Sequence, residues 1–418
     1  MSMNIAIFSD NFYPEISGIS DSIILTSSEL TRRGHNVIFI APRYSKKDYI
    51  LAGEKADDHP DMIAGIHRKI IRLPSIYYPA SPTGQSRIAF PILTSLSAIK
   101  KFRPDIIHSQ SPFGVGLEAL FISRILGVPL FGTNHTPAAE FMPPILRHWK
   151  WIHSWSAKMT SRYYSWYYNR CVFVSAPCTA LLEDMARHGF HRKNISNKAI
   201  SNPIDLTTFL SGHDQSKDSL KKRFDFSPHT VLYTGRLAPE KGVDTVIRAI
   251  ALARHDIPDI IFVATGHGNA LNDLRLLSVK LGITDKVKFL GFVPTDTYPL
   301  VYQASDIFTI MSTAETQSLS LMYAMAVGMP VIGARAWGLP EYIDEVRDSH
   351  GSYNKTGDGF LLEPGDAEGL AKILVELFKN PSRMAELGRN GTIAAQRFSP
   401  AAVADIWEAI FRKTIEKK

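Results

Sequence analysis

The stretch Tyr-Thr-Gly-Arg-Leu-Ala-Pro-Glu-Lys-Gly, from Tyr233 to Gly242, constrains the fold more than any other part of the chain. It follows an apolar run typical of a buried strand and precedes 243–254, where apolar residues recur at helical spacing. A strand, a glycine turn and a helix start place outward-pointing N–H groups together, and such a place favours an anion. The stretch therefore predicts an α/β unit with an anion site at its turn.

Two cations lie within this turn, after Gly235. Arg236 can donate two parallel hydrogen bonds to phosphate oxygens, and Lys241 supplies a compact positive charge. In an isolated loop such side chains are usually solvated charges, which is the alternative interpretation. The strand, the glycines and the helix together favour a phosphate site in which Arg236 and Lys241 stabilise negative charge.

A second motif, 312–333, reads Ser-Thr-Ala-Glu-Thr-Gln-Ser-Leu-Ser-Leu-Met-Tyr-Ala-Met-Ala-Val-Gly-Met-Pro-Val-Ile-Gly. Its acidic residue, Glu315, follows an apolar strand at 307–310 and leads into a helix of small residues. In this order the two motifs resemble those of the retaining glycosyltransferases of family 4. The resemblance covers nearly the whole chain and implies the GT-B fold, in which two doubly wound, Rossmann-like α/β domains face each other across a cleft.

At 418 residues the chain is too long for one ordinary domain. The resemblance implies an N-terminal acceptor-binding domain over 1–200 and a C-terminal nucleotide-sugar-binding domain over 201–399. It also implies that a last helix, within 400–418, crosses back onto the first domain. The segment 200–205 is the predicted hinge, because its Asn202-Pro203 step breaks regular structure.

Apolar runs predict the strands of both sheets. In the first domain they lie at 4–9, 36–41, 69–73, 106–109, 130–134 and 171–174. In the second domain they lie at 260–264, 287–290, 307–310, 331–334 and 359–362. Helices are predicted at 19–33, 243–254, 367–379 and from 400 onward, and the polar stretch 46–60 is predicted to be a surface loop.

Composition and charge indicate the cellular compartment and the kind of partner. The two cysteines, Cys171 and Cys178, suit neither a redox pair nor a structural zinc site, so a reducing compartment is expected. The start has no basic region typical of a signal peptide, and no apolar run approaches the roughly 20 residues that span a bilayer. Net charge +7 favours an acidic partner. We expect a cytoplasmic protein, peripheral on the inner face of the cell membrane, with no nucleic acid partner.

The resemblance assigns most of the donor site. Gly18 matches the glycine of the N-terminal loop that closes on the donor phosphate, although the family usually has two glycines and Ser17 takes the first place. Gly266 lies in a glycine-rich turn, and Phe292 and Val293 match the segment whose backbone holds the base. The remaining donor residues are Gly235, Ser318, Leu319 and Ser320, the last three offering N–H groups at a helix start.

Three further residues carry the chemistry that the resemblance implies. His135 follows the strand 130–134 and would face the donor sugar; a buried, hydrogen-bonded histidine is the alternative. Glu315 matches the first glutamate of the family's Glu-x7-Glu motif, which contacts the transferred sugar. The second glutamate, which usually binds ribose hydroxyls, is replaced by Tyr323. A phenol can still hydrogen-bond to a hydroxyl group, but it cannot accept two bonds as a carboxylate does.

No cofactor and no metal are expected. The chain has no Asp-x-Asp motif, and its histidines are not spaced as a metal pair. Protein cations and helix dipoles would then stabilise the leaving diphosphate. Retention through a front-face mechanism, with the leaving phosphate accepting the acceptor's proton, is implied by the resemblance alone.

A stretch rich in Trp, Tyr and basic residues spans 145–170, and no Asp or Glu occurs between Glu140 and Glu183. Aromatic rings and cations suit an anionic membrane surface. The alternative is an aromatic helix packed inside the N-terminal domain. The first loop and the run 107–130 resemble the family members that glycosylate membrane lipids, which favours the membrane interpretation.

The resemblance thus implies a retaining hexosyltransferase that moves a sugar from a UDP- or GDP-linked donor to a hydroxyl acceptor, and we expect a membrane lipid as that acceptor. The main rival is a non-catalytic nucleotide-sugar-binding protein of the same fold, suggested by Tyr323. A nicotinamide-dependent enzyme is disfavoured, because Leu271 occupies the third glycine position after Gly266-His267-Gly268.

Overall fold

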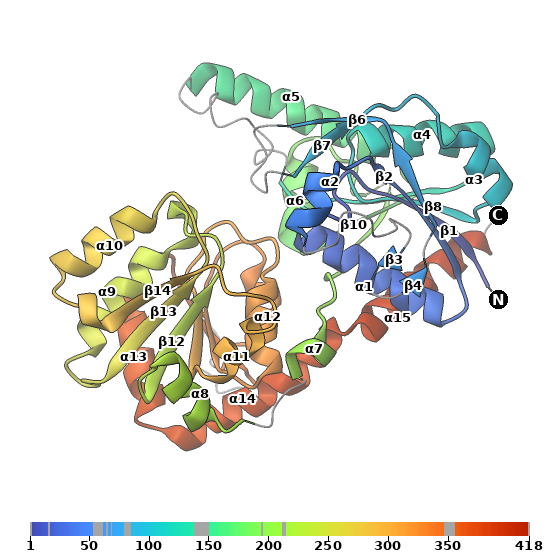
Figure 1. The fold of residues 1–418 in the computed structure, drawn as a ribbon. Coiled ribbons are helices and arrows are strands. Elements are labelled where there is room, and N and C mark those ends of the chain that lie inside the picture. Colours follow the sequence, from blue (N-terminus) through green and yellow to red (C-terminus); the bar gives the residue numbers. More distant parts are fainter. Residues whose placement is uncertain are drawn as a thin grey trace. The chain divides into compact units, whose positions relative to one another are not determined.

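The computed structural model (Figure 1) describes residues 2–15, 17–52, 62–63, 66–67, 69–78, 85–137, 150–193, 195–210, 215–346 and 356–416. The chain divides into two compact units. Unit 1 comprises Met1–Pro203 together with Pro400–Lys418, and unit 2 comprises Ile204–Ser399. The division falls directly after the Asn-Pro step of the predicted hinge.

Unit 1 is built on a parallel sheet in the order β11-β10-β9-β8-β1-β2-β5. Most of its strands are apolar runs buried along their length, as expected for a sheet covered on both faces. The strands of the sheet are β1 Asn4–Phe8, β2 Asn36–Pro42, β5 Lys69–Leu73, β8 Ile106–Ser109, β9 Leu130–Thr133, β10 Phe173–Ala176 and β11 Ser196–Ala199. Two small antiparallel pairs are β3 Met62–Ile63 with β4 Ile66–His67, and β6 Ser75–Tyr77 with β7 Arg87–Ala89.

The helices of unit 1 are α1 Gly18–Arg32, α2 Lys46–Leu51, α3 Leu96–Phe102, α4 Gly114–Leu126, α5 Lys150–Tyr168, α6 Thr179–Arg187 and α15 Pro400–Ile415. The last of these comes from the far end of the chain, yet its apolar face is part of the unit 1 core. Val403, Trp407 and Phe411 pack in one cluster with residues of β1 and β9 such as Ile5 and Phe131. The C-terminal helix is therefore a structural part of unit 1.

Two sequence predictions for unit 1 are wrong. The stretch 46–60 was expected to be a loop, but 46–51 forms α2, because the Asp48 carboxylate accepts hydrogen bonds from Ser45 N (2.8 Å) and Oγ (2.7 Å). Residues 53–60 lie outside the described part. The strand expected at 171–174 starts two residues later, because Cys171 N still donates to Tyr168 O (3.1 Å) in the turn that ends α5.

Unit 2 has a parallel sheet in the order β14-β13-β12-β15-β16-β17. The order reverses between β12 and β15, and in open α/β sheets ligands bind outside the carboxyl ends of the strands at such a reversal. The strands are β12 His229–Thr234, β13 Ile260–Thr265, β14 Val287–Gly291, β15 Ile307–Ile310, β16 Val331–Ala334 and β17 Gly359–Leu362. The helices are α7 Leu206–Leu210, α8 Lys217–Phe224, α9 Val243–Ala253, α10 Leu271–Lys280, α11 Tyr298–Gln303, α12 Leu319–Ala326, α13 Ala367–Phe378 and α14 Pro381–Ala395.

Candidate active site

The glycine turn after β12 lies at the carboxyl edge of the unit 2 sheet, where the strand order reverses. Gly242 has a φ of +64°, and a Cβ added there would lie 2.1 Å from the carbonyl oxygen of Met311, just after β15. Any side chain at this position would separate the loops that leave β12 and β15. Glycine is therefore required for these two loops to meet.

Hydrogen bonds join the same two loops. The carbonyl oxygen of Glu240, in a short 3₁₀ turn over Pro239–Lys241, accepts from Thr313 N at 2.9 Å and from Ser312 Oγ at 3.2 Å. The two sequence motifs, more than seventy residues apart, are thereby held in one fixed register.

An ion pair results from this register. Lys241 Nζ donates to Glu315 Oε1 at 2.7 Å, and the two side chains are only 12% and 15% exposed. Burial raises the pKa of Glu315, an effect that the adjacent Lys241 opposes. A cation and a carboxylate are thus held together nearly out of water, so an anion that contacts Lys241 has to compete with Glu315.

Arg236 lies at the start of the turn and points into solvent. Its guanidinium is 3.0 Å from Glu240 Oε1, and the Arg236 side chain is 56% exposed. An exposed pair of this kind contributes little to stability, so the guanidinium could leave Glu240 for a stronger anion at small cost. This position suits both the phosphate prediction and the solvated-charge alternative.

The predicted base-binding segment lies beside the glycine turn. Gly266 has a φ of +101°, and a Cβ there would lie 2.1 Å from the carbonyl oxygen of Gly235. Phe292 N donates to His267 Nε2 at 3.2 Å, which ties the turn after β13 to the turn after β14. The Phe292 side chain is 74% exposed, and Val293 is half-buried. The structure therefore brings Gly235, Gly266 and Phe292 to one edge of the sheet.

The start of α12 follows Glu315 closely. Ser318 precedes the helix, and its Oγ accepts from Leu321 N at 3.2 Å. Leu319 and Ser320 are the first two helical residues, whose N–H groups have no acceptor within the helix. The start of α12, where the predicted donor residues Ser318, Leu319 and Ser320 lie, thus follows closely after the Lys241–Glu315 pair.

Tyr323 lies on α12 and is half-buried. Its ring stacks on Phe209, with centroids 3.7 Å apart and planes 9° apart. Phe209 in turn makes edge contacts with Tyr298 and Tyr302. The ring is therefore part of an aromatic cluster, while the ribose role of its hydroxyl stays a prediction.

Sequence reasoning missed a cluster of hydroxyl groups next to this aromatic cluster. Thr234 Oγ1, at the end of β12, is 2.5 Å from Tyr302 OH and accepts from Tyr298 OH at 2.9 Å. Tyr298 and Tyr302 are four residues apart on α11, so both side chains lie on one face. The four-residue spacing of the two tyrosines could have indicated that their hydroxyl groups lie together. It does not show that the helix packs against the end of β12.

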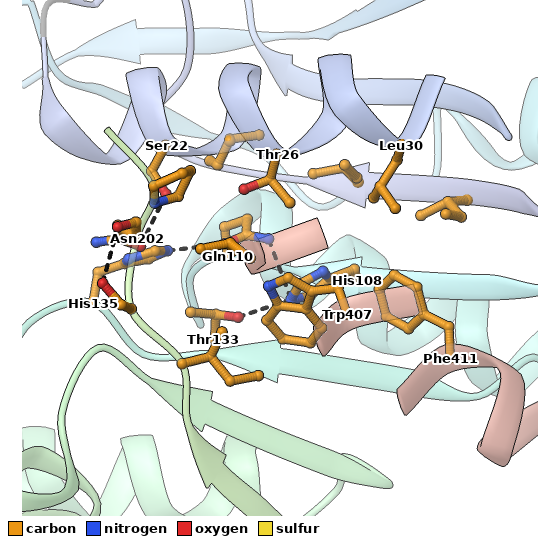
Figure 2. Close-up of a pocket in the computed structure, with 17 residues that line it drawn as sticks. Ser22, Thr26, Leu30, His108, Gln110, Thr133, His135, Asn202, Trp407 and Phe411 are labelled. Atoms are coloured by element: carbon orange, nitrogen blue, oxygen red, sulfur yellow. Dashed lines mark hydrogen bonds between the residues drawn. The ribbon is translucent and has the colours of Figure 1, made fainter. Parts of the chain in front are cut away.

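Gly18 and His135 belong to unit 1. Gly18 is the first residue of α1 and is exposed, and the Oγ of Ser17 accepts from Ser20 N at 3.1 Å. His135 lies just after β9 and is buried; its Nε2 is 2.9 Å from Gln110 Oε1 (Figure 2). Burial lowers the pKa of His135 to about 4, so the imidazole is neutral at pH 7. The alternative weighed for this residue, a buried and hydrogen-bonded histidine, describes its surroundings.

The aromatic-basic helix α5 has one face packed inside unit 1 and an opposite face that is exposed and basic. Tyr164, Tyr167 and Tyr168 are buried in unit 1. The other face is exposed and presents Lys158, Met159, Arg162 and Trp166, and the exposed Arg170 follows two residues after the helix ends. The Arg170 guanidinium lies 4.3 Å from the centroid of the Trp166 ring. Residues 145–149 and the side chains of 150–155 lie outside the described part.

In the part of the chain that the structure describes, no three His, Cys, Asp or Glu side chains gather as a metal ion would require. Among the described helices, none is both long and apolar enough to cross a membrane.

Two doubly wound α/β units, one with a cation-bearing glycine turn where its strand order reverses, define a class of two-domain α/β proteins with a candidate ligand site at the carboxyl edge of a sheet. Residues 16–208 match the family model described as Glycosyltransferase Family 4, and residues 214–393 match the model described as Glycosyl transferases group 1. The chain belongs to the family 4 glycosyltransferases.

Known relatives agree with this assignment. The chain is 27% identical to the alpha-monoglucosyldiacylglycerol synthase of Streptococcus pneumoniae over 335 residues, 79% of this chain and 70% of that protein. It is 24% identical to the alpha-monoglucosyldiacylglycerol synthase of Acholeplasma laidlawii over 419 residues, covering 99% and 98% of the two chains. The solved structure of Anabaena HepE in complex with UDP superposes with a TM-score of 0.73 at 19% identity, over 98% of this chain and 100% of that one. The fold is GT-B.

Proposed function

We propose that this glycosyltransferase moves a hexose from a UDP- or GDP-linked sugar to a hydroxyl group of a membrane lipid, with retention of configuration. The relatives named for a glucosylated diacylglycerol support the lipid acceptor, and the UDP complex of the HepE structure supports a nucleotide donor. Retention and the absence of a metal follow from the family resemblance and belong to the same proposal.

The observation that carries the proposal is the Lys241–Glu315 pair at the carboxyl edge of the unit 2 sheet. When the glycosidic bond breaks, negative charge grows on the diphosphate. A lysine that is already positioned and partly shielded from water stabilises that charge, in competition with its partner Glu315. Arg236, whose guanidinium is exposed, adds a second cation. Glu315, tied to Lys241, is proposed to contact the transferred sugar.

The exposed face of α5 supports a membrane partner. It presents Lys158, Arg162 and Trp166, Arg170 just after the helix lies over the Trp166 ring, and no acidic residue lies on the helix. Basic side chains are attracted to anionic headgroups, and Trp prefers the depth at which headgroups meet acyl chains. The acceptor would then be reached at the membrane surface.

The test is a transfer assay with UDP-glucose and GDP-mannose, each labelled in the sugar, with and without EDTA. The acceptors are diacylglycerol in mixed phosphatidylglycerol vesicles and, in parallel, a soluble alkyl alcohol. We expect labelled α-linked glycolipid from one donor, undiminished by EDTA. Transfer only to the soluble alcohol would refute the lipid acceptor, and a β-linked product would refute retention.

The rival is a nucleotide-sugar-binding protein without transferase activity, a possibility raised by Tyr323 in place of a glutamate. The same preparation distinguishes the two. Tight binding of UDP or GDP in calorimetric titration, together with no transfer from either donor to either acceptor, would favour the rival.

A further inference from the structure

Gln110 lies between two buried histidines in unit 1. Its Oε1 is 2.9 Å from His135 Nε2, and its Nε2 is 3.2 Å from His108 Nε2. All three side chains are less than one-tenth exposed. They come from the ends of β8 and β9, so the parallel register of these strands brings them together (Figure 2).

The amide group links the protonation of the two rings. A carbonyl oxygen can only accept, so His135 must carry a proton on Nε2 in order to donate to it. The amide N–H can only donate, so His108 must present an unprotonated Nε2 and hold its proton on Nδ1. If the amide were turned around, both tautomers would reverse. One glutamine therefore determines which nitrogen of each ring carries the proton.

Further contacts hold His108 in place. Its Nε2 is 2.8 Å from Thr133 Oγ1, which is 2.7 Å from Ser175 Oγ on β10. The Trp407 ring of α15 packs on the His108 ring, with centroids 4.4 Å apart. The group lines a cavity of about 30 Å³, so there is little room for the rings to turn.

Both rings are neutral near pH 7. Burial lowers the pKa of His108 to about 3, with a smaller effect from His135, and burial lowers the pKa of His135 to about 4. The tautomers set by the amide are therefore the states present under working conditions.

We propose that Gln110 is a positioning residue for His135: it fixes the proton of the ring on Nε2, so that Nδ1 is the nitrogen that accepts a hydrogen bond. This inference rests on the proposed function and on the role toward the transferred sugar that the family resemblance implies for His135. A neutral acceptor suits a sugar hydroxyl group, whereas a cationic or turned ring would not accept that bond. The described hydrogen bonds of His108, Thr133 and Ser175 reach His135 through Gln110.

The direct test is the tautomeric state, read from long-range ¹H–¹⁵N correlations of protein labelled in its 14 histidines. The signals are assigned with His108→Asn and His135→Asn variants. We expect the proton on Nε2 of His135 and on Nδ1 of His108, unchanged from pH 6 to pH 8. The opposite pair of tautomers would overturn the proposal.

Two substitutions of Gln110 separate positioning from folding. Gln110→Met removes both hydrogen bonds at similar length, and we expect a mixture of His135 tautomers. Gln110→Glu can still accept from His135 but cannot donate to His108, so His135 should keep its proton on Nε2. A Gln110→Met protein whose His135 signals match those of the unaltered protein would refute the positioning role.

Kinetics supply a second measurement. In Gln110→Met we expect kcat to fall about 10- to 100-fold, with the KM for the donor changing less than about threefold. The matched control is Gln85→Met, which removes another buried glutamine of unit 1 that donates to Pro14 O and Asp48 O and does not line the cavity beside His135. Its kcat should stay within about threefold.

The two proposals fail in different ways. If the unaltered protein transfers no sugar but shows the expected tautomers, the proposed function fails and the geometry of Gln110 stands. If it transfers sugar and Gln110→Met leaves kcat unchanged, the positioning role is wrong. If Gln85→Met lowers kcat as much as Gln110→Met does, the loss reflects general loosening of unit 1 and the proposal is overturned.

Discussion

At the scale of single residues, the paired Lys241 and Glu315 have the most direct consequences. Each partner depends on the other, because an unpaired charge in a largely dry position is costly. The pair thus keeps a cation ready at the strand-order reversal while no anion is bound. Replacing Lys241 with a neutral side chain tests whether this cation acts in turnover.

Replacing Lys241 with Met should lower turnover by roughly 10- to 100-fold, because one charge-assisted hydrogen bond is worth about 1.5–3 kcal/mol. Steady-state kinetics with the preferred donor measure the effect. The control is Lys280→Met, at an exposed position on α10. Turnover in Lys241→Met equal to that of the control would remove Lys241 from the site.

Tyr323→Phe tests the phenol alone, since it keeps the ring that stacks on Phe209. If the hydroxyl group contacts ribose, the nucleotide should bind about 0.5–1.5 kcal/mol more weakly, the net contribution of one neutral hydrogen bond. Calorimetric titration measures this, and a melt of the same variant should show an unchanged fold. Unaltered affinity would leave Tyr323 with a packing role only.

At the scale of elements, the helices α5 and α15 each pack one face against unit 1. The buried face of α5 attaches it to unit 1, and its exposed face presents the cations beside Trp166. On α15, Glu408 contacts Arg33 of the α1 end at 3.2 Å and Arg412 on its own helix. Helix α5 therefore offers a candidate membrane-binding surface, whereas the ion pairs of Glu408 help to hold α15 on unit 1.

Lys158→Ser with Arg162→Ser should weaken sedimentation with phosphatidylglycerol vesicles, and salt should weaken that of the unaltered protein, because screening shortens the reach of surface charge. The matched control replaces Lys100 and Lys101, two exposed cations of α3, with Ser. Equal binding to neutral phosphatidylcholine vesicles would contradict an electrostatic membrane face.

The attachment of α15 should weaken in acid. Hydrogen bonding to Arg412, and also to Arg33, lowers the pKa of Glu408 from 4.5 to about 2. A lowered folded-state pKa gives stability that is present above the unfolded pKa and is lost as pH falls from about 4.5 toward 2. The melting temperature of Glu408→Gln should therefore lie below that of the unaltered protein at pH 7, and the gap should close toward pH 3. A gap that is independent of pH would contradict this account.

At the scale of the whole molecule, unit 1 is built from two segments that lie at opposite ends of the chain. Unit 1 is completed only when the last helix is made, because Trp407 and Phe411 belong to its core. Unit 2 is continuous from Ile204 to Ser399. Stability of the first unit therefore depends on the end of the chain.

Trp407→Ala should cost unit 1 about 3–5 kcal/mol, the usual range for removing a buried aromatic side chain. Hydrogen exchange followed by mass spectrometry should show faster exchange in β1, β8 and β9, with β12 and β15 unchanged. Faster exchange in both units alike would show that they unfold as one.

Much of both sheets is determined by the sequence itself. The runs at 69–73, 106–109, 307–310, 331–334 and 359–362 match the observed strands residue for residue. Strands covered on both faces are largely apolar, so 331–334 and 359–362 are visible as short apolar runs, while 69–73 and 106–109 combine apolar residues with a few polar ones. The glycine turn after β12 was equally visible, because its φ and close contacts exclude other residues at Gly242.

The contacts that give the candidate site its chemistry were decided by the tertiary structure. Lys241 and Glu315 are 74 positions apart, and Gln110 and His135 are 25 apart. No local pattern states which side chains meet, since strand order and register set these distances. The same holds for Tyr323, whose stacking partner Phe209 comes from a short helix before the sheet begins. Local apolar patterns predict strands because each residue of a strand is buried according to its own position. The contact partners of a side chain depend instead on which distant segments the fold brings next to it.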